Sequence, residues 1–216
     1  LCEVLINEAP QVYVETNSAC AIYSMTQTPE QQYGIYHFLE KADDDKSLKD
    51  SIYYQLESTE MAKGNYLGSP ALAMNVLGKQ AKRFVFFDLE KSALELSLIH
   101  ISEPTRLLIQ ATQVGMKCLL WYGFMTEDDK ESLDNYIVSS LEKAGIKDYI
   151  GVELTMNSIK KDSILCNPGI LGSGILATNV SQTSKDIILD YSNKLVDIYK
   201  DAKYKDYDGS LYIQHL

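Results

Sequence analysis

The stretch KCLLWYGFMTEDDKESLDNYIVSSLEKAGIKDYIGVELTM, residues 117–156, carries the clearest indication of the fold class. Its two ends, KCLLWYG at 117–123 and YIGVELTM at 149–156, are apolar and rich in aromatic and β-branched residues, which is typical of buried strands. The segment between them, from about Glu127 to Ala144, has helical character. A strand, a helix and a second strand in this order predict a crossover unit of an α/β sheet.

The same alternation continues towards the carboxyl end of the chain. A glycine-rich loop, CNPGILGSG, leads into a predicted strand ILATNV, which is followed by a predicted helix from about Ser184 to Lys200 and a last strand SLYIQ. Alternating strands and helices of this kind usually form a sheet with parallel core strands. We therefore expect an α/β fold with a parallel core.

The amino-terminal half contains a second set of alternating elements. QVYVE at Gln11–Glu15 predicts the first core strand, and it runs into a loop of small polar residues. Gly68-Ser69-Pro70 predicts a helix start, and RFVFFDL predicts a second strand with Asp88 near its end. The polar residues from about 29 to 63 have loosely helical spacing, so we expect a helical insertion between these strands. CEVLINEA has helical spacing and Leu1 is not a methionine, so we expect the true N-terminus to be absent.

Composition excludes several classes of protein. The chain has 216 residues, of which 45% are hydrophobic, and it contains no apolar run of about 18 residues, so we expect a soluble, cytoplasmic protein of one domain with no membrane segment. Its four cysteines are scattered singly, which predicts neither a disulfide framework nor a metal site. The net charge of −10 argues against a protein that wraps nucleic acid by neutralising phosphates.

Several short motifs, taken in order, carry a family resemblance. They are VYVETNSACAIY, YLGSPALA, FFDLE, LLWYGF, LEKAGIKDYIGVELTM and LGSGILATN. Together they resemble the J-type 23S ribosomal RNA adenine-N6-methyltransferases along nearly the whole chain apart from one break. The resemblance implies a class I methyltransferase fold of Rossmann-like type, S-adenosylmethionine as cofactor and 23S ribosomal RNA as substrate. In open α/β sheets of this kind, the ligand lies at the carboxyl ends of the strands.

The resemblance also implies which residues bind the cofactor. Glu15 matches the acidic end of the family's first strand, Thr16 begins the cofactor loop, and Asn17 replaces a cofactor-contacting histidine. Ser69 matches the serine of the family's helix start. Asp88, at the end of the second strand, would accept hydrogen bonds from the ribose hydroxyls of the adenosyl group.

The cofactor loop departs from the family pattern. Ala19 and Ala21 replace glycines that let the family's backbone approach the ligand closely. A strand-to-helix turn of small residues is the alternative interpretation of this loop.

The central part of the chain breaks the resemblance. Only 32 residues separate Asp88 from Trp121, too few for the strands and helices that a class I methyltransferase places there, so we expect a single incomplete domain without its central strands. The segment LSLIHISEPTR at 96–106 is similar to the translation of a sequencing-library adapter and predicts a chimeric junction. The alternative is that LSLIHIS is a genuine strand and EPTR a turn.

The break removes the residues that would perform the reaction. The family's catalytic Asp-Pro-Pro-Tyr motif occurs nowhere in the chain, so we assign no catalytic residue and expect no methyl transfer. Two other functions stay open. One is a methyltransferase of another substrate class, which the acidic charge would suit better; the other is a non-catalytic α/β interaction protein whose 15 tyrosines form a contact surface.

Overall fold

The computed structural model describes residues 1–16, 18, 20–87, 102–157, 171–205 and 207–216. The chain divides into two units, Leu1–Ala93 and Leu94–Leu216, and each is described by itself below. Asn17, Asp88 and residues 96–101 of the adapter-like segment lie outside the described residues. The expectation of one incomplete domain therefore stays a prediction.

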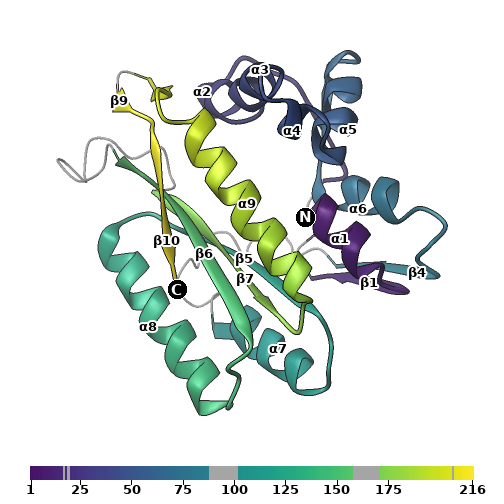
Figure 1. Cartoon of the computed structure of the whole chain (residues 1–216), viewed down its shortest axis with the longest axis vertical. Helices are drawn as coiled ribbons and strands as arrows, with labels where there is room; N and C mark the ends of the chain where they lie inside the picture. The colour runs from purple at the N-terminus through teal and green to yellow at the C-terminus, as the bar shows by residue number, and fades with distance from the viewer. Residues whose placement is uncertain (17, 19, 88–101, 158–170, 206) are drawn as a thin grey trace. The chain divides into compact units, whose positions relative to one another are not determined.

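Two short pairs of strands organise the amino-terminal unit. Strand β1 (Val12–Glu15) pairs in parallel with β4 (Arg83–Phe86), beside which it lies in Figure 1. Glu15 lies opposite Phe86 at the carboxyl end of the pair. Strand β2 (Ile22–Ser24) pairs antiparallel with β3 (Asn65–Leu67). The predicted first and second strands are therefore neighbours, as expected for consecutive strands of a parallel sheet.

A series of short helices joins β2 to β3. They are α2 (Pro29–Gln31), the π-helical turn η1 (Gln32–Tyr36), α3 (His37–Ala42), α4 (Lys46–Lys49) and α5 (Ile52–Met61). Three of them have a side-chain N-cap of the preferred kind, in which Thr28, Asp45 or Ser51 accepts a backbone N–H of the first turn. These caps explain why a polar stretch with weak apolar spacing breaks into several short helices.

Helices α1 (Cys2–Glu8) and α6 (Ser69–Leu77) pack against each other and contribute to a small core with the β1–β4 pair. The buried residues of this core are Leu5, Ala73, Leu77 and Ala81, and the partly buried rings of Tyr13 and Phe84 lie against them. Helix α6 begins as predicted, with Gly68 as its N-cap and Pro70 in its first turn, where the missing N–H costs nothing.

The carboxyl-terminal unit contains a four-stranded sheet in the order β10-β6-β7-β5. Its strands are β5 (Cys118–Phe124), β6 (Tyr149–Met156), β7 (Gly172–Thr178) and β10 (Leu211–His215), and its helices are α7 (Ser102–Gln113), α8 (Glu127–Lys143) and α9 (Gln182–Ile198). A two-stranded ribbon of β8 (Lys203–Tyr204) and β9 (Tyr207–Asp208) precedes β10.

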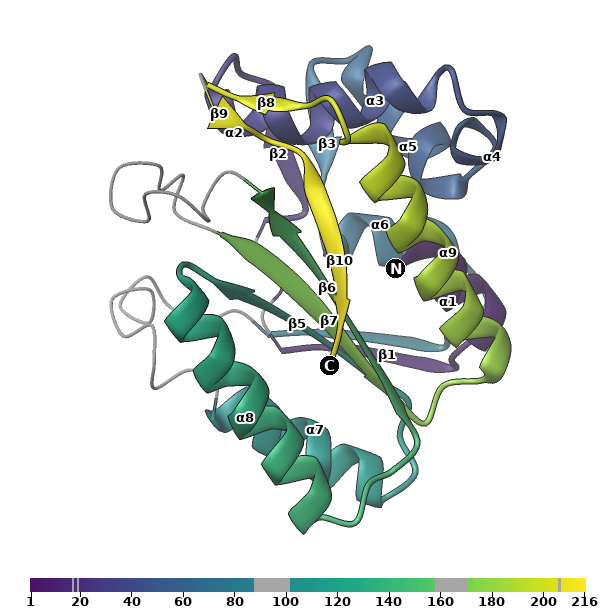
Figure 2. The same cartoon turned by 60° about the vertical axis from the view of Figure 1, so that its left-hand side comes forward.

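The expectation of parallel neighbouring strands is wrong for this sheet, because every adjacent pair in it is antiparallel. In each of the crossovers β5–α8–β6 and β7–α9–β10, the two strands are parallel to each other but are not neighbours. One strand of the other crossover lies between them. Both crossovers move towards the β10 edge of the sheet, but the strands of one crossover run opposite to the strands of the other. Right-handed crossovers then put α8 and α9 on opposite faces, as Figure 2 shows. The fold is mixed α/β.

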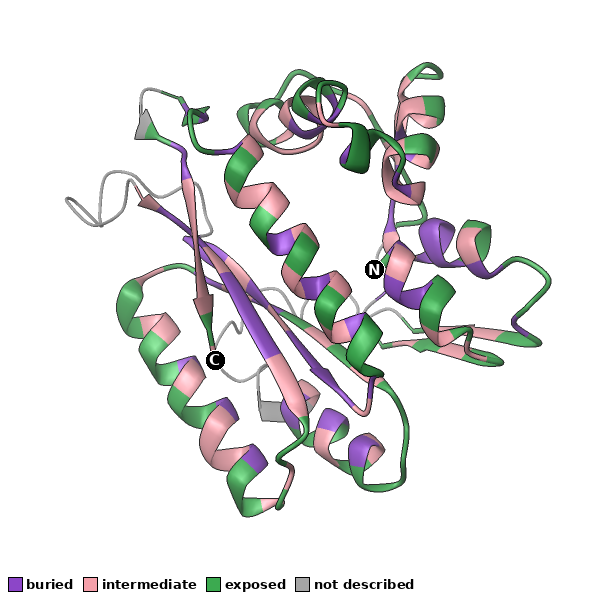
Figure 3. Ribbon diagram, viewed as in Figure 1, coloured by how far each residue is buried: buried purple, intermediate pink, exposed green. Residues whose placement is uncertain are grey.

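The core of this unit lies between the sheet and helices α7 and α8. Its buried residues are Leu108, Tyr122, Phe124, Leu133, Ile137, Leu141, Leu171 and Leu176. Figure 3 shows buried residues gathered on the middle strands β6 and β7. Strand β5 is paired on one side only among the described residues, and two of its apolar side chains, Leu119 and Trp121, are 39% and 61% exposed.

Helix α7 contradicts the turn that one alternative for the adapter-like segment required, while the chimeric junction stays a prediction. The residues SEPTR begin this helix, so EPTR does not form the turn that the strand-and-turn alternative required. Thr105 is fully buried and Leu108 belongs to the core. The described end of the adapter-like segment is thus part of a packed helix.

Candidate functional site

Two of the residues singled out by the sequence meet at the carboxyl end of β1. The Ser69 hydroxyl, in the first turn of α6, donates a hydrogen bond to Oε1 of Glu15, the last residue of β1. The two residues are 54 positions apart in the chain. This hydrogen bond joins the end of a core strand to the N-terminus of a helix, where backbone N–H groups and the helix dipole favour negative charge.

A tyrosine completes the surroundings of the Glu15 carboxylate. The Tyr13 hydroxyl donates to Oε2 of Glu15 at 3.2 Å, so each carboxylate oxygen has one donor. Partial burial raises the pKa of Glu15, and the two hydrogen bonds oppose that rise. The same burial and the nearby Glu15 charge raise the pKa of Tyr13, which keeps its proton available for donation. The site therefore holds a half-buried carboxylate in a fixed orientation.

The loop after β1 makes hydrogen bonds with the residue that follows β4 and with the N-cap of α6. The backbone N–H and the hydroxyl of Ser18 both donate to the carbonyl oxygen of Phe87 at 2.9 Å. Farther along, the N–H of Gly68 donates to the carbonyl of Ala21 at 2.8 Å. A Cβ at Gly68 would overlap the carbonyl oxygen of Cys20, so this close approach requires glycine.

The predicted cofactor residues are thus only partly assembled within the described residues. Glu15 and Ser69 are in contact, and Thr16 is exposed directly beside Glu15. Asn17 and Asp88 lie outside the described residues. Sequence reasoning missed Tyr13, although a signal existed: in a strand, residues two apart point to the same face, so Tyr13 and Glu15 in VYVE had to share one side.

A second polar cluster, in the carboxyl-terminal unit, was not predicted. The Tyr122 hydroxyl on β5 donates to Oε1 of Glu153 on β6 at 2.9 Å, and Lys130 Nζ on α8 lies 2.5 Å from both Glu153 Oε2 and Asp134 Oδ2. Glu153 is fully buried. A Cβ at Gly174, on the strand between β5 and β6, would overlap the Tyr122 ring. The absence of that Cβ lets the tyrosine reach across β7.

The buried cluster alters the titration of its members. Burial raises the pKa of Glu153, the neighbouring Asp134 raises it further, and Lys130 and Tyr122 lower it in part. Burial lowers the pKa of Lys130, but its close contacts with the carboxylates of Asp134 and Glu153 outweigh that effect and raise it overall. The sequence signal was a charged residue in the middle of the apolar strand YIGVELTM.

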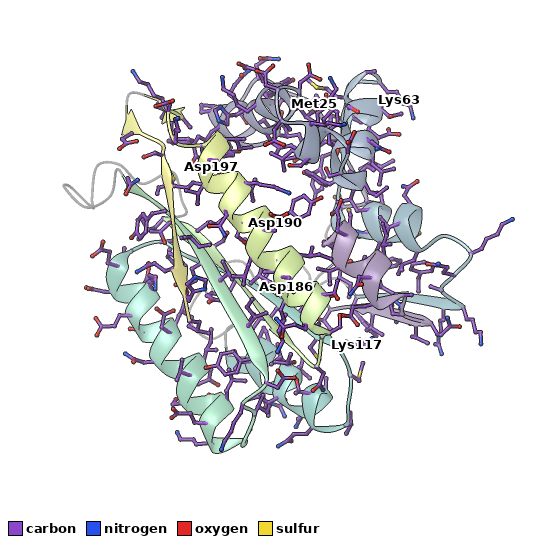
Figure 4. The ribbon with its side chains drawn as sticks, in the orientation of Figure 1. Met25, Lys63, Lys117, Asp186, Asp190 and Asp197 are labelled. Carbon is purple, nitrogen blue, oxygen red and sulfur yellow. The ribbon has the colours of Figure 1, made fainter. Side chains whose placement is uncertain are left out.

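Metal and membrane sites receive no positive support. Within the described ranges, no three or more His, Cys, Asp or Glu side chains are grouped so that they could hold a metal ion. In that same part of the chain, no helix has the length and apolar character needed to cross a membrane. Helix α9 carries Asp186, Asp190 and Asp197 along one side (Figure 4), where Lys194 is paired with Asp190. Three carboxylates with one lysine leave this side acidic, which disfavours phosphate contacts.

Comparison with known proteins defines the fold. No family model and no curated protein matches the chain. Among solved structures, it is similar to protein LPL1258 of Legionella pneumophila strain Philadelphia 1, which belongs to the family model DUF519, with a TM-score of 0.69 and 18% sequence identity. The likeness covers 100% of this chain and 92% of that protein. At this level of identity the two proteins share a fold, which is α/β, and no shared function follows.

Proposed function

We propose that the amino-terminal unit is part of an S-adenosylmethionine site, and that the chain derives from a methyltransferase acting on an adenine N6 of 23S ribosomal RNA. The contact between Glu15 and Ser69 carries this proposal, because the family resemblance assigns both residues to the cofactor and the fold brings them together across 54 positions. The position also suits a ligand, since α/β proteins bind ligands at the carboxyl ends of their strands.

The chemistry of the site fits this cofactor. S-adenosylmethionine supplies a methyl group on a positively charged sulfur and also carries an ammonium group. A half-buried carboxylate with an ordered orientation, as at Glu15, attracts such cationic groups more strongly than an exposed one. Parallel β4 ends directly beside β1, and the next residues along the chain lead to Asp88, the proposed partner of the ribose hydroxyls. We assign binding and orientation to these residues and expect no turnover, because the Asp-Pro-Pro-Tyr motif is absent.

A methyltransferase of another substrate class is the second candidate. The net charge of −10 and the acidic side of α9 favour a substrate other than RNA. Titration with deproteinised ribosomal RNA at several salt concentrations separates the two candidates. A steep loss of affinity with salt would support RNA, and an absence of binding at low salt would favour the other class.

Calorimetric titration with S-adenosylmethionine tests the cofactor site. We expect binding by the unmodified chain, a loss of about tenfold or more in affinity for Glu15→Gln and a smaller loss for Ser69→Ala, because a hydrogen bond to a charged group contributes about 1.5–3 kcal/mol. Glu40→Gln is the matched control, because this side chain is 73% exposed on α3. A folded chain that shows no binding would refute the proposal and favour the non-catalytic interaction protein.

A further inference from the structure

The amino-terminal unit contains a fully buried carboxyl group close in the chain to the candidate site. Glu57, on α5 of the helical insertion, is fully buried, and its Oε2 accepts a hydrogen bond from the backbone N–H of Leu67 at 3.0 Å. Leu67 is the last residue of β3 and is itself buried. Helix α5 and strand β3 lie side by side in Figure 2, in agreement with their contacts. A fully buried glutamate is uncommon unless something holds it there.

The residue that follows Leu67 is the point where the site is assembled. Gly68 is the N-cap of α6, its N–H donates to the carbonyl of Ala21, and its lack of a Cβ leaves room for the carbonyl of Cys20. The next residue, Ser69, donates to Glu15. The Leu67 amide therefore lies one residue from the contact with the loop after β1 and two residues from the Glu15 contact.

Within the described ranges, the other carboxylate oxygen of Glu57 has no hydrogen bond to replace those it would make with water. Oε1 has no hydrogen-bond partner among the described residues and is shielded from solvent. Desolvation raises the pKa of Glu57 to about 7, the Leu67 N–H opposes the rise, and the Glu60 charge adds to it. A group that is costly to bury and makes one specific hydrogen bond is more easily explained by a positioning role than by stability alone.

We propose that Glu57 is a positioning residue of the candidate cofactor site, which fixes the Leu67 amide and thereby the Gly68–Ser69 turn against the cofactor loop. In this arrangement a carboxylate of the helical insertion accepts a hydrogen bond from β3, the strand that leads directly to Gly68 and Ser69. The inference rests on the proposed function only for the identity of the ligand. The mechanical link from Glu57 to Ser69 is a property of the unit itself.

The test uses two substitutions of Glu57 and one control in the full chain. Glu57→Gln keeps an acceptor for the Leu67 N–H, whereas Glu57→Met keeps the length of the side chain and removes the acceptor. Glu40→Gln removes the same charge from a side chain that is 73% exposed on α3 and is the control. Backbone amide resonances of Leu67, Gly68 and Ser69 report the geometry, and S-adenosylmethionine affinity reports the site.

We expect Glu57→Met to shift all three amide resonances and to weaken cofactor binding about tenfold, with Glu57→Gln and Glu40→Gln close to the unmodified chain. Tenfold corresponds to about 1.4 kcal/mol. A Glu57→Met protein that shifts only the Leu67 resonance and binds the cofactor unchanged would overturn the inference and leave the proposed function standing. If the unmodified chain binds no cofactor, the proposed function fails, and the inference is tested by the Gly68 and Ser69 resonances alone. Shifted resonances in Glu57→Met would then support the link from Glu57 to Ser69, and unshifted resonances would refute it.

Discussion

Lys130→Met is the substitution whose effect follows most directly from the structure. Lys130 Nζ lies 2.5 Å from a carboxylate oxygen of both Glu153 and Asp134, and only 14% of the lysine side chain is exposed. Methionine keeps the apolar stem and removes the charge. Two carboxylates then remain close together without their cation, and one of them, Glu153, has no access to water.

The size of the effect can be bounded from burial. Removing one partner of a buried ion pair costs about 3–5 kcal/mol, because the remaining charge is left uncompensated. Asp134 is 26% exposed, so water compensates part of its charge, and we expect the lower end, about 3 kcal/mol. Lys185→Met is the matched control: this lysine is 13% exposed, but its partner Asp148 is 74% exposed, so we expect a loss below about 1 kcal/mol.

The dependence on pH gives this prediction a second readout. Burial raises the pKa of Glu153, so the folded state holds this proton more tightly than the unfolded chain, and stability falls as pH rises past the ordinary carboxyl range. Loss of Lys130 raises that pKa further. The deficit of Lys130→Met should therefore be largest at pH 8 and clearly smaller at pH 5, where Glu153 can take up a proton.

Urea unfolding monitored by tryptophan fluorescence measures this loss of stability in the carboxyl-terminal unit. The chain has a single tryptophan, Trp121, and it lies on β5 of the sheet that contains the cluster. A loss under about 1 kcal/mol at pH 8, or a loss of equal size at both pH values, would refute the argument that Lys130 neutralises a buried carboxylate.

Three further outcomes are expected. Gly174→Ala should destabilise the carboxyl-terminal unit by about 1–3 kcal/mol in the same urea assay, because the new methyl group displaces the Tyr122 ring; an unchanged midpoint would contradict this. Ile137→Ala should cost about 2–5 kcal/mol, because this side chain is fully buried, whereas its exposed neighbour Tyr136 should tolerate alanine with a loss well below that of Ile137. Glu57→Gln should remove a component of stability that falls as pH rises through about 7, since a raised carboxyl pKa favours folding at lower pH; circular-dichroism melting at pH 6 and pH 8 measures it.

The elements of the fold could largely be predicted from local patterns. Strand β6 has the predicted bounds, Tyr149–Met156, because an uninterrupted apolar run between polar segments leaves little choice. Helix α6 begins at Ser69, where glycine and proline mark the start. The pairing of the strands could not be predicted in the same way. It depends on which strand fills the position skipped by each crossover, and no local pattern encodes that choice.

The candidate site was predictable to the extent that a resemblance could name its residues. Glu15 and Ser69 were both named, but their hydrogen bond depends on the packing of α6 beside β1 and could not be read from a separation of 54 positions. The Glu153 cluster shows the opposite case. A glutamate within an apolar strand signalled a buried partner, but its partners, Tyr122 and Lys130, were set by the register with Gly174 and by the face that α8 presents.

The interleaving of β5–α8–β6 with β7–α9–β10 has a consequence for how this unit can be shortened or split. Neighbouring strands lie about 4.8 Å apart, so β5 and β6 are separated by roughly 10 Å until β7 fills the slot between them. A fragment that stops after β6 would keep an open slot with unpaired N–H and C=O groups on both sides, and a fragment that starts at β7 would have the same defect between β7 and β10. Two such fragments would each be aggregation-prone alone and complementary when mixed. The sheet therefore depends on pairings between segments distant in sequence, a property that generally goes with slower folding.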